Sequence, residues 1–259
     1  MSFARFALRT ATVKALRGRT FAGDMVRDSE IGPIDDAAKD KEIPFVVVFT
    51  DDSEIAGHGT DLIGNDGKQC LVFEIGVTTR MKANGDWAIP TTDAGMELTI
   101  DAIERQIKLA LSDPADTAWG ELWRDLVLGI ESKKSQRGAA AKDGLRFAGR
   151  QLVIDVTMPR DPHPGRPLGP LWQRFLALVA ADPDLAGHLP LLTQLATGGA
   201  TDWPEWKRVR AAYGLSLDRA RALKLTPPAA AEAASPPFAP VTVDPAAPVP
   251  PTYTPTLVE

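Results

Sequence analysis

The sequence is poor in the residue types that most often build metal and redox sites. Its 259 residues include a single cysteine, Cys70, and three histidines, His58, His163 and His188. One thiol forms no intrachain disulfide and no thiolate metal cluster, and cysteine-poor chains are typical of reducing compartments. No histidine has a second one at helix-neighbour spacing, which zinc-binding helices use. We therefore predict no metal site, and folding in a reducing cytoplasm.

Excess positive charge and long apolar runs are also missing. The formal net charge is −5 and the pI is about 5.3, so no chain-wide positive field is available to bind a polyanion by counterion release. Residues 2–17 alternate basic and apolar side chains, unlike the continuous apolar stretch of an export signal or a membrane span. We therefore expect no membrane partner.

The short motifs of common enzymes are lacking as well. The sequence has no Gly-x-Gly-x-x-Gly after a strand, no phosphate-binding loop ending in Gly-Lys-Ser or Gly-Lys-Thr, and no Gly-x-Ser-x-Gly elbow. Cys70 lies beside Leu71 in an apolar stretch, where a thiol packs as a small hydrophobe, so we expect it in the core. We accordingly expect no catalytic residues, no cofactor and no enzymatic activity.

Composition divides the chain into three zones. Residues 1–159 hold 20 basic and 25 acidic side chains, and residues 160–225 hold 9 and 6. Residues 226–259 have no basic side chain and include ten prolines and eight alanines, too little bulky apolar surface to offset the entropy of ordering them. We predict a folded domain at 1–159, a helical appendage at 160–225 and a Pro/Ala-rich extended tail at 226–259.

Apolar periodicity predicts an α+β fold for the first zone. Apolar side chains recur at helical spacing over residues 3–17, 96–111 and 119–130, and short β-branched runs predict strands at 25–28, 45–49, 70–80 and 145–158. The dipeptide Asn84-Gly85 predicts a hairpin that leads to a strand at 87–89. The intervening basic stretch is expected to be a loop, and Gly149 to mark a β-bulge; that stretch contains Lys133, Lys134, Arg137 and Lys142. Helices on a mostly antiparallel sheet follow from this order.

An acidic segment, Asp51 to Lys68, invites two interpretations. Clustered carboxylates can hold a divalent ion, yet Ile63 and Asn65 stand where a calcium loop needs further acidic ligands, and Gly76 stands where a nuclease would place a lysine after Glu74. The alternative is a long surface or interface loop between two strands. We favour the loop.

A second region permits two interpretations near the end of the helical zone. Val209, Gly214 and Leu215 approximate the helix-turn-helix pattern, in which a glycine allows the turn and apolar residues lock two helices. Arg210 occupies a position that the pattern reserves for a small residue. A structural helical hairpin is the expected interpretation, and DNA contact is the alternative.

The order of features in residues 1–159 carries a resemblance to a known family. It comprises the opening helix Phe3-Ala4-Arg5-Phe6-Ala7-Leu8-Arg9-Thr10 to Arg17, then Gly23 to Ser29, the strand Pro44-Phe45-Val46-Val47-Val48-Phe49-Thr50-Asp51-Asp52, the strand from Cys70, the helix around Ile103 and the closing strand Arg146 to Val156. This order resembles the tail-terminator, or tail-completion, proteins of long-tailed bacteriophages, a group of minor tail proteins. The resemblance does not extend to residues 160–259.

The resemblance implies a structural role in the virion. Such proteins form a homo-oligomeric ring, commonly a hexamer, that caps the finished tail tube, ends its polymerisation and joins the tail to the head. The implied partners are further copies of the chain, the tail tube protein and the head-tail connector protein, with DNA only passing through the lumen. The implied location is the neck region of the virion tail, after assembly in the host cytoplasm.

Charge suggests which residues would serve that role. Asp51, Asp52, Asp61 and Asp66 are candidates for a subunit interface or the lumen, where negative charge would let DNA slide without sticking. The alternative function is a DNA-associated adaptor or regulator that uses the helix-turn-helix-like segment near Gly214.

Overall fold

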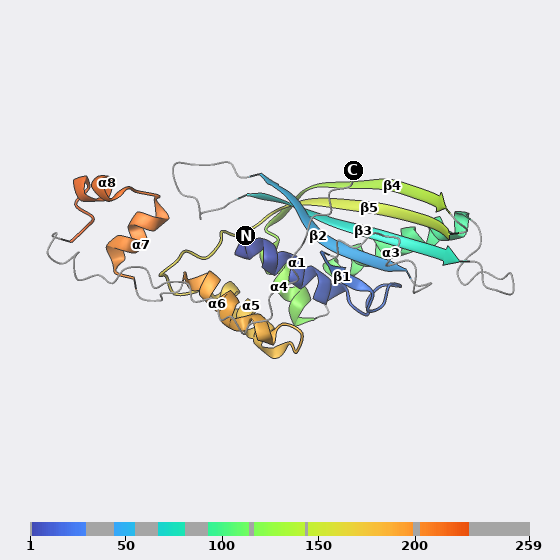
Figure 1. The fold of residues 1–259 in the computed structure, drawn as a ribbon, viewed down its shortest axis with the longest axis horizontal. Helices are drawn as coiled ribbons and strands as arrows, with labels where there is room; N and C mark the ends of the chain where they lie inside the picture. Colours follow the sequence, from blue (N-terminus) through green and yellow to red (C-terminus); the bar gives the residue numbers. More distant parts are fainter. Residues whose placement is uncertain are drawn as a thin grey trace, which may run out of the picture.

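The chain folds as an α+β protein in which helices pack on one face of a five-stranded sheet (Figure 1). The computed structural model describes residues 2–29, 44–54, 67–80, 93–113, 117–142, 145–198 and 203–227. Its strands are β1 (Val26–Asp28), β2 (Phe45–Glu54), β3 (Lys68–Arg80), β4 (Gly129–Lys142) and β5 (Leu145–Thr157), in the spatial order β1-β2-β3-β5-β4. The expected α+β class with a mostly antiparallel sheet is confirmed.

The three longest strands are paired with an almost uninterrupted register. β3 is antiparallel to β2 and to β5, and β5 is antiparallel to β4, whereas the short β1 runs parallel to β2. Gly149 pairs with Gly76 on one side and Gly138 on the other, without a shift in register. The bulge predicted at Gly149 is therefore wrong. The register shifts instead between Thr50 and Ser53 and between Ile130 and Ser132.

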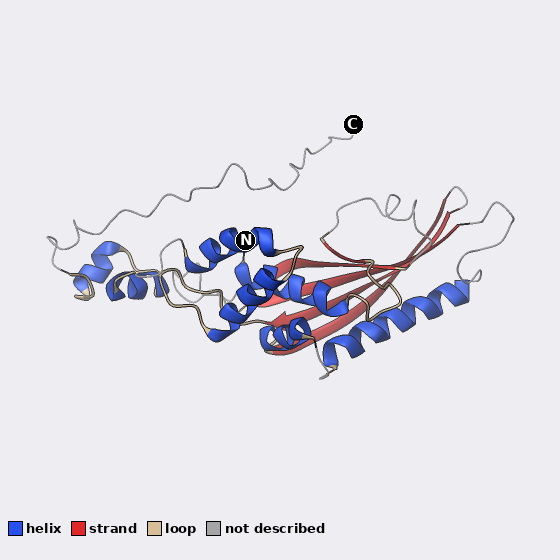
Figure 2. Cartoon of the chain, turned by 90° about the horizontal axis from the view of Figure 1, so that it is seen from below, coloured by secondary structure: helices blue, strands red, loops and turns tan. Residues whose placement is uncertain are grey.

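The core lies between one sheet face and three helices. These are α1 (Phe3–Leu16), α3 (Asp93–Ser112) and α4 (Ala118–Leu126), which lie on the same side of the sheet in Figure 1, and α3 runs beside the strands in the view from below (Figure 2). Because side chains alternate along a strand, every second residue faces this layer. The buried sheet residues of this face are Val46, Val48, Leu71, Phe73, Ile75, Val77, Ala148, Leu152, Ile154 and Val156.

Two further helices belong to the same core. α5 (Pro170–Ala181) and α6 (Leu189–Thr197) are separated by a short 3-10 helix, Ala186–His188. The buried Phe175 of α5 meets Phe3 with ring centroids 5.4 Å apart, and Trp172 also lies 5.4 Å from Phe3. The boundary expected at residue 159 therefore does not mark the end of the hydrophobic core, because the apolar stripe of α5 packs on α1 and α4 and not only on its neighbours in the appendage.

Polar contacts attach the segment after β5 to both ends of α1. At the start of α1, the Asp161 carboxylate accepts hydrogen bonds from Ser2 Oγ (3.0 Å), Phe3 N (3.2 Å) and Ala4 N (2.7 Å). Near its end, Lys14 forms ion pairs with Asp182 (2.6 Å) and Asp184 (2.9 Å). These contacts tie the two ends of the segment 161–184 to the two ends of α1.

The described chain ends with two short helices, α7 (Glu205–Ala212) and α8 (Leu217–Ala222). They are joined at Gly214, whose φ of 56° lies in the left-handed region that glycine adopts without strain. Ala220 is the one buried residue in the two helices. The predicted helical hairpin is thus present, with little core of its own.

One expected loop is a strand. The basic stretch Lys133 to Lys142 forms most of β4, which pairs with β5 along its full length. Its polar side chains lack the period-2 apolar pattern because β4 is an edge strand, exposed from Glu131 to Gly138. The predicted hairpin at Asn84-Gly85, the strand at 87–89 and the tail beyond Pro227 lie outside the described residues.

Candidate assembly interface

The sheet face opposite the helices has a mixed surface. It carries the rows Phe45–Gly76–Gly149–Gly138, Val47–Glu74–Gln151–Gln136 and Phe49–Val72–Val153–Lys134. No helix in the described part of the chain lies on this face (Figure 1). Phe45, Val47 and Val72 are buried, while Glu74, Gln151 and Val153 are half-exposed.

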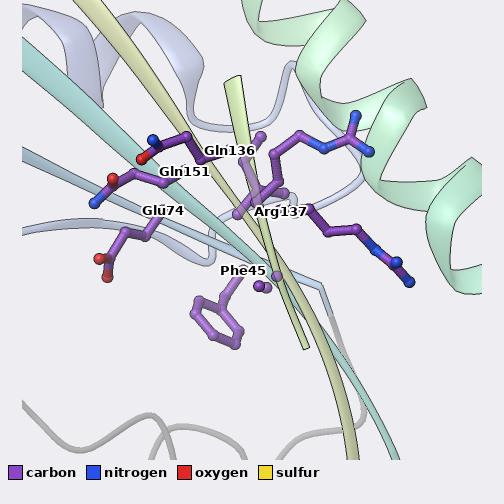
Figure 3. Close-up of a pocket in the computed structure, with 10 residues that line it drawn as sticks. Phe45, Glu74, Gln136, Arg137 and Gln151 are labelled. Carbon is purple, nitrogen blue, oxygen red and sulfur yellow. The ribbon is translucent and has the colours of Figure 1, made fainter. Parts of the chain in front are cut away.

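A hollow of about 290 Å³ follows the row of three glycines across this face. The ring of Phe45 lies over Gly76 so closely that a Cβ atom on Gly76 would overlap it, whereas nothing would lie within 4 Å of a Cβ on Gly138. Figure 3 shows Glu74, Gln136 and Gln151 side by side next to the hollow, with Arg137 extending away toward a helix. The hollow is thus apolar at one end and rimmed by amides and a carboxylate.

The helix-covered face carries a cluster of charges where α3 crosses β5 and β4. Arg150 contacts Glu97 (3.0 Å), Glu104 (3.2 Å) and Asp101, and Arg137 contacts Glu97 (2.5 Å). Burial acts to raise the pKa of Glu104. Hydrogen bonds from Lys108, Ser135 and Arg150 outweigh this effect and hold the pKa of Glu104 below its usual value.

The arginine in this cluster is stabilised in the same way. Burial acts to lower the pKa of Arg150, but its hydrogen bonds to Asp101 and Glu104 prevail and raise that pKa. Opposite charges here satisfy one another, so the cluster holds α3 against the sheet.

The two edges of the sheet differ in charge. β4, the upper edge in Figure 1, exposes Lys133 and Lys134, for which the described residues provide no carboxylate partner. On the opposite side, β1 covers β2 only from Val46 to Val48. Beyond that point, the acidic residues Asp51, Asp52 and Glu54 lie in the strand β2. One edge is therefore basic and the other acidic.

The structure places part of the predicted acidic segment in a strand. Asp51 and Asp52 belong to β2, which continues to Glu54, and Lys68 begins β3. The loop predicted from Asp51 to Lys68 is therefore shorter than expected, because the backbone of β2 continues to pair with β3 through Ser53 and Glu54. Asp51 is exposed; the side chain of Asp52 and all of Asp61 and Asp66 lie outside what the structure describes.

Two further sequence predictions can be placed. Cys70 lies in β3 and is only half-buried, on the face away from the helices, so the core position predicted for it is wrong. Within the described ranges, no three His, Cys, Asp or Glu side chains are grouped so that they could hold a metal ion. None of the helices described has both the length and the apolar character needed to cross a bilayer.

The α7–α8 hairpin is locally basic. Residues 203–227 contain six basic and two acidic side chains, and Tyr213 and Leu223 are exposed. The Arg210 side chain donates to the carbonyl of Leu215 (3.1 Å), so this arginine, which departs from the helix-turn-helix pattern, stabilises the turn. α8 has six residues, about 9 Å of helix, which is short for a helix that reads a groove.

No protein-family model matches the chain, and no curated protein is significantly similar to it in sequence.

Proposed function

We propose that this chain is a structural virion protein that assembles with copies of itself into a ring, caps the tail tube of a long-tailed phage and joins the tail to the head connector. This role needs neither a cofactor nor a catalytic step. In this proposal the protein resides in the neck region of the tail after assembly in the host cytoplasm, and DNA passes through the ring as cargo.

The observation that supports self-assembly is the 14-residue edge strand β4. An edge strand presents a row of backbone N–H and C=O groups that another strand can pair with. β4 is exposed from Glu131 to Gly138, and at about 3.4 Å per residue it offers an edge of roughly 45 Å. Such a surface recognises protein backbone, which suits a subunit that assembles.

Negative-stain imaging and light scattering of the purified full-length protein test this proposal. We expect closed rings of uniform diameter and a mass that is a small multiple of 27.8 kDa. Added during polymerisation of the tube protein, the rings should sit at tube ends and limit tube length. A protein that stays monomeric at high concentration and leaves tube length unchanged would exclude the proposed role.

A second candidate function rests on the basic hairpin. A DNA-associated adaptor would use α7 and α8, whose positive charge contrasts with the net charge of −5 of the whole chain. Binding of the full-length protein to duplex DNA that weakens steeply with salt, and that is lost in an Arg219→Glu, Lys224→Glu variant, would favour this function. Salt-independent or absent binding would count against it.

A further inference from the structure

The basic edge of the sheet exposes two lysines on β4. Along β4, Glu131 pairs with Lys68, Ser135 donates to Glu104 (3.0 Å) and Arg137 pairs with Glu97. Lys133 and Lys134 are exposed, and the described part of the chain supplies no carboxylate to either. Within the described residues, their charges thus have no ion-pair partner.

The acidic edge of the sheet is the part of β2 that β1 does not cover. β1 has three residues and ends opposite Val48, where Ser29 N donates the last hydrogen bond to the Val48 carbonyl (2.9 Å). From Phe49 to Glu54, no strand in the described ranges pairs with the outer side of β2. The register shift at this point places both Asp51 and Asp52 opposite Cys70.

Strand direction makes the two edges compatible. β2 and β5 run in one direction, and β3 and β4 run in the other. If subunits are repeated side by side in one orientation, β4 of one copy therefore meets β2 of the next in antiparallel register. The alternation β2-β3-β5-β4 then continues across the contact without a break.

We infer that subunits associate head to tail through these edges: the segment of β4 that contains Lys133 and Lys134 in one copy pairs with the segment of β2 that contains Asp51 and Asp52 in the next copy. The inference rests on the proposed self-assembly and names its contact. Pairing of two β4 edges about an axis near Lys133 and Lys134 is disfavoured, since it would oppose lysine to lysine. A contact between different edges repeats around an axis and closes into a ring where the rotation allows.

Charge reversal on each edge tests the contact. The basic-edge variant is Lys133→Glu, Lys134→Glu, and the acidic-edge variant is Asp51→Lys, Asp52→Lys. Each alone opposes like charges at every contact, so we expect association weakened by about tenfold or more, measured by sedimentation. The control variant Arg219→Glu, Lys224→Glu changes the net charge by the same amount as the basic-edge variant, in α8 and the turn that follows it, and should associate as the wild type does.

Restoration is the decisive readout. An equimolar mixture of the two edge variants again opposes unlike charges at every contact, so it should regain the wild-type mass with alternating composition. A chain carrying all four reversals should regain it alone. Circular dichroism of each variant confirms that weakened association is not loss of fold, which the exposed position of Lys133, Lys134 and Asp51 favours.

The outcomes separate the inference from the proposed function. Edge variants that assemble normally, or a mixture that fails to recover, would overturn the inference even if wild-type rings cap tubes. Recovery in the mixture without any effect on tube length would support the contact and remove the tail role. A wild-type protein that never associates would remove both.

Discussion

At the scale of single residues, the row of glycines across the sheet shows how one missing side chain can make room for another. Gly76 has no Cβ, and the ring of Phe45 occupies the space that a Cβ would take. Phe45 is 4% exposed, so the close approach also removes most of the ring from water. Gly138 lies two strands away in the same row, with nothing packed over it.

These two glycines should respond oppositely to alanine. Gly76→Ala forces the Phe45 ring out of place, and we expect a loss of about 1–3 kcal/mol in the free energy of unfolding. Gly138→Ala meets no atom within 4 Å and restricts the unfolded chain, so it should be neutral or stabilising by about 0.5 kcal/mol. Urea unfolding of both variants checks this, and equal losses would contradict the packing described.

Glu104 provides a residue-scale prediction about pH. Its folded-state pKa lies below the usual value of about 4.5, so the unfolded state binds the proton more readily. The stabilisation is therefore complete above about pH 4.5 and is lost as the pH falls through the folded-state pKa. Glu104→Gln should lower stability by about 1–2 kcal/mol at neutral pH and lose less stability than the wild type on acidification.

Unfolding measured at several pH values, with Glu205→Gln as the control, tests this. Glu205 is 76% exposed in its ion pair with Arg208, so its replacement should change the free energy of unfolding by at most about 0.5 kcal/mol. Parallel profiles for Glu104→Gln and the wild type would show that Glu104 does not contribute in this way.

At the scale of elements, the N-terminus of α1 is capped from a distant part of the chain. Ser2 caps Arg5 N locally, while Asp161 accepts from Phe3 N and Ala4 N and is itself 158 residues away from Phe3. The carboxylate satisfies two backbone donors that a helix start leaves free and lies at the positive end of the helix dipole. One side chain thereby stabilises α1 and fixes the chain after β5.

Asp161→Ala should therefore destabilise the protein by about 1–2 kcal/mol. Asp125→Ala is the matched control, because Asp125 is 52% exposed and pairs with Arg174 on the surface, which predicts an effect of at most about 0.5 kcal/mol. Thermal unfolding distinguishes the two variants. Asp161→Asn, which keeps an acceptor oxygen, should recover part of the loss.

At the scale of the whole molecule, one core joins the sheet, α1, α3 and α4 to the helices α5 and α6. Phe175 is fully buried and lies near Phe3, Phe6 and Trp119 at centroid distances of 5.4, 6.1 and 6.4 Å. Aromatic contacts between segments so distant in sequence bind the chain from its first helix to α5 into a single packed unit.

Phe175→Ala should accordingly cost about 3–5 kcal/mol, the loss typical of a deleted core aromatic. Leu191→Ala on α6 removes a side chain that is 49% exposed, and we expect a change of at most about 0.5 kcal/mol. A single cooperative transition that shifts in Phe175→Ala would agree with one core. An unshifted main transition would mean that α5 is dispensable to the fold.

The sequence alone predicts the elements whose residues bury one face. The stripe Met96, Ile100, Ile103 and Ile107 predicts α3, and the β-branched run at 45–49 predicts the start of β2, because burial imposes a period of 3.6 or 2 on apolar residues. The acidic segment at Asp51 and Asp52 could also be recognised as a surface feature from its charge. Local composition was sufficient for these predictions.

Only the tertiary structure decided what polar segments do. β4 has the composition of a loop and becomes a strand because β5 offers its backbone a partner along the full length and α3 offers carboxylates to Ser135 and Arg137. The same pairing turns Lys133 and Lys134 into one edge of a sheet and Asp51 into the other. The charges can be read from the sequence. Their placement on two opposite edges depends on the order of the strands in the sheet, and that order is determined by pairing between segments that are distant in the sequence.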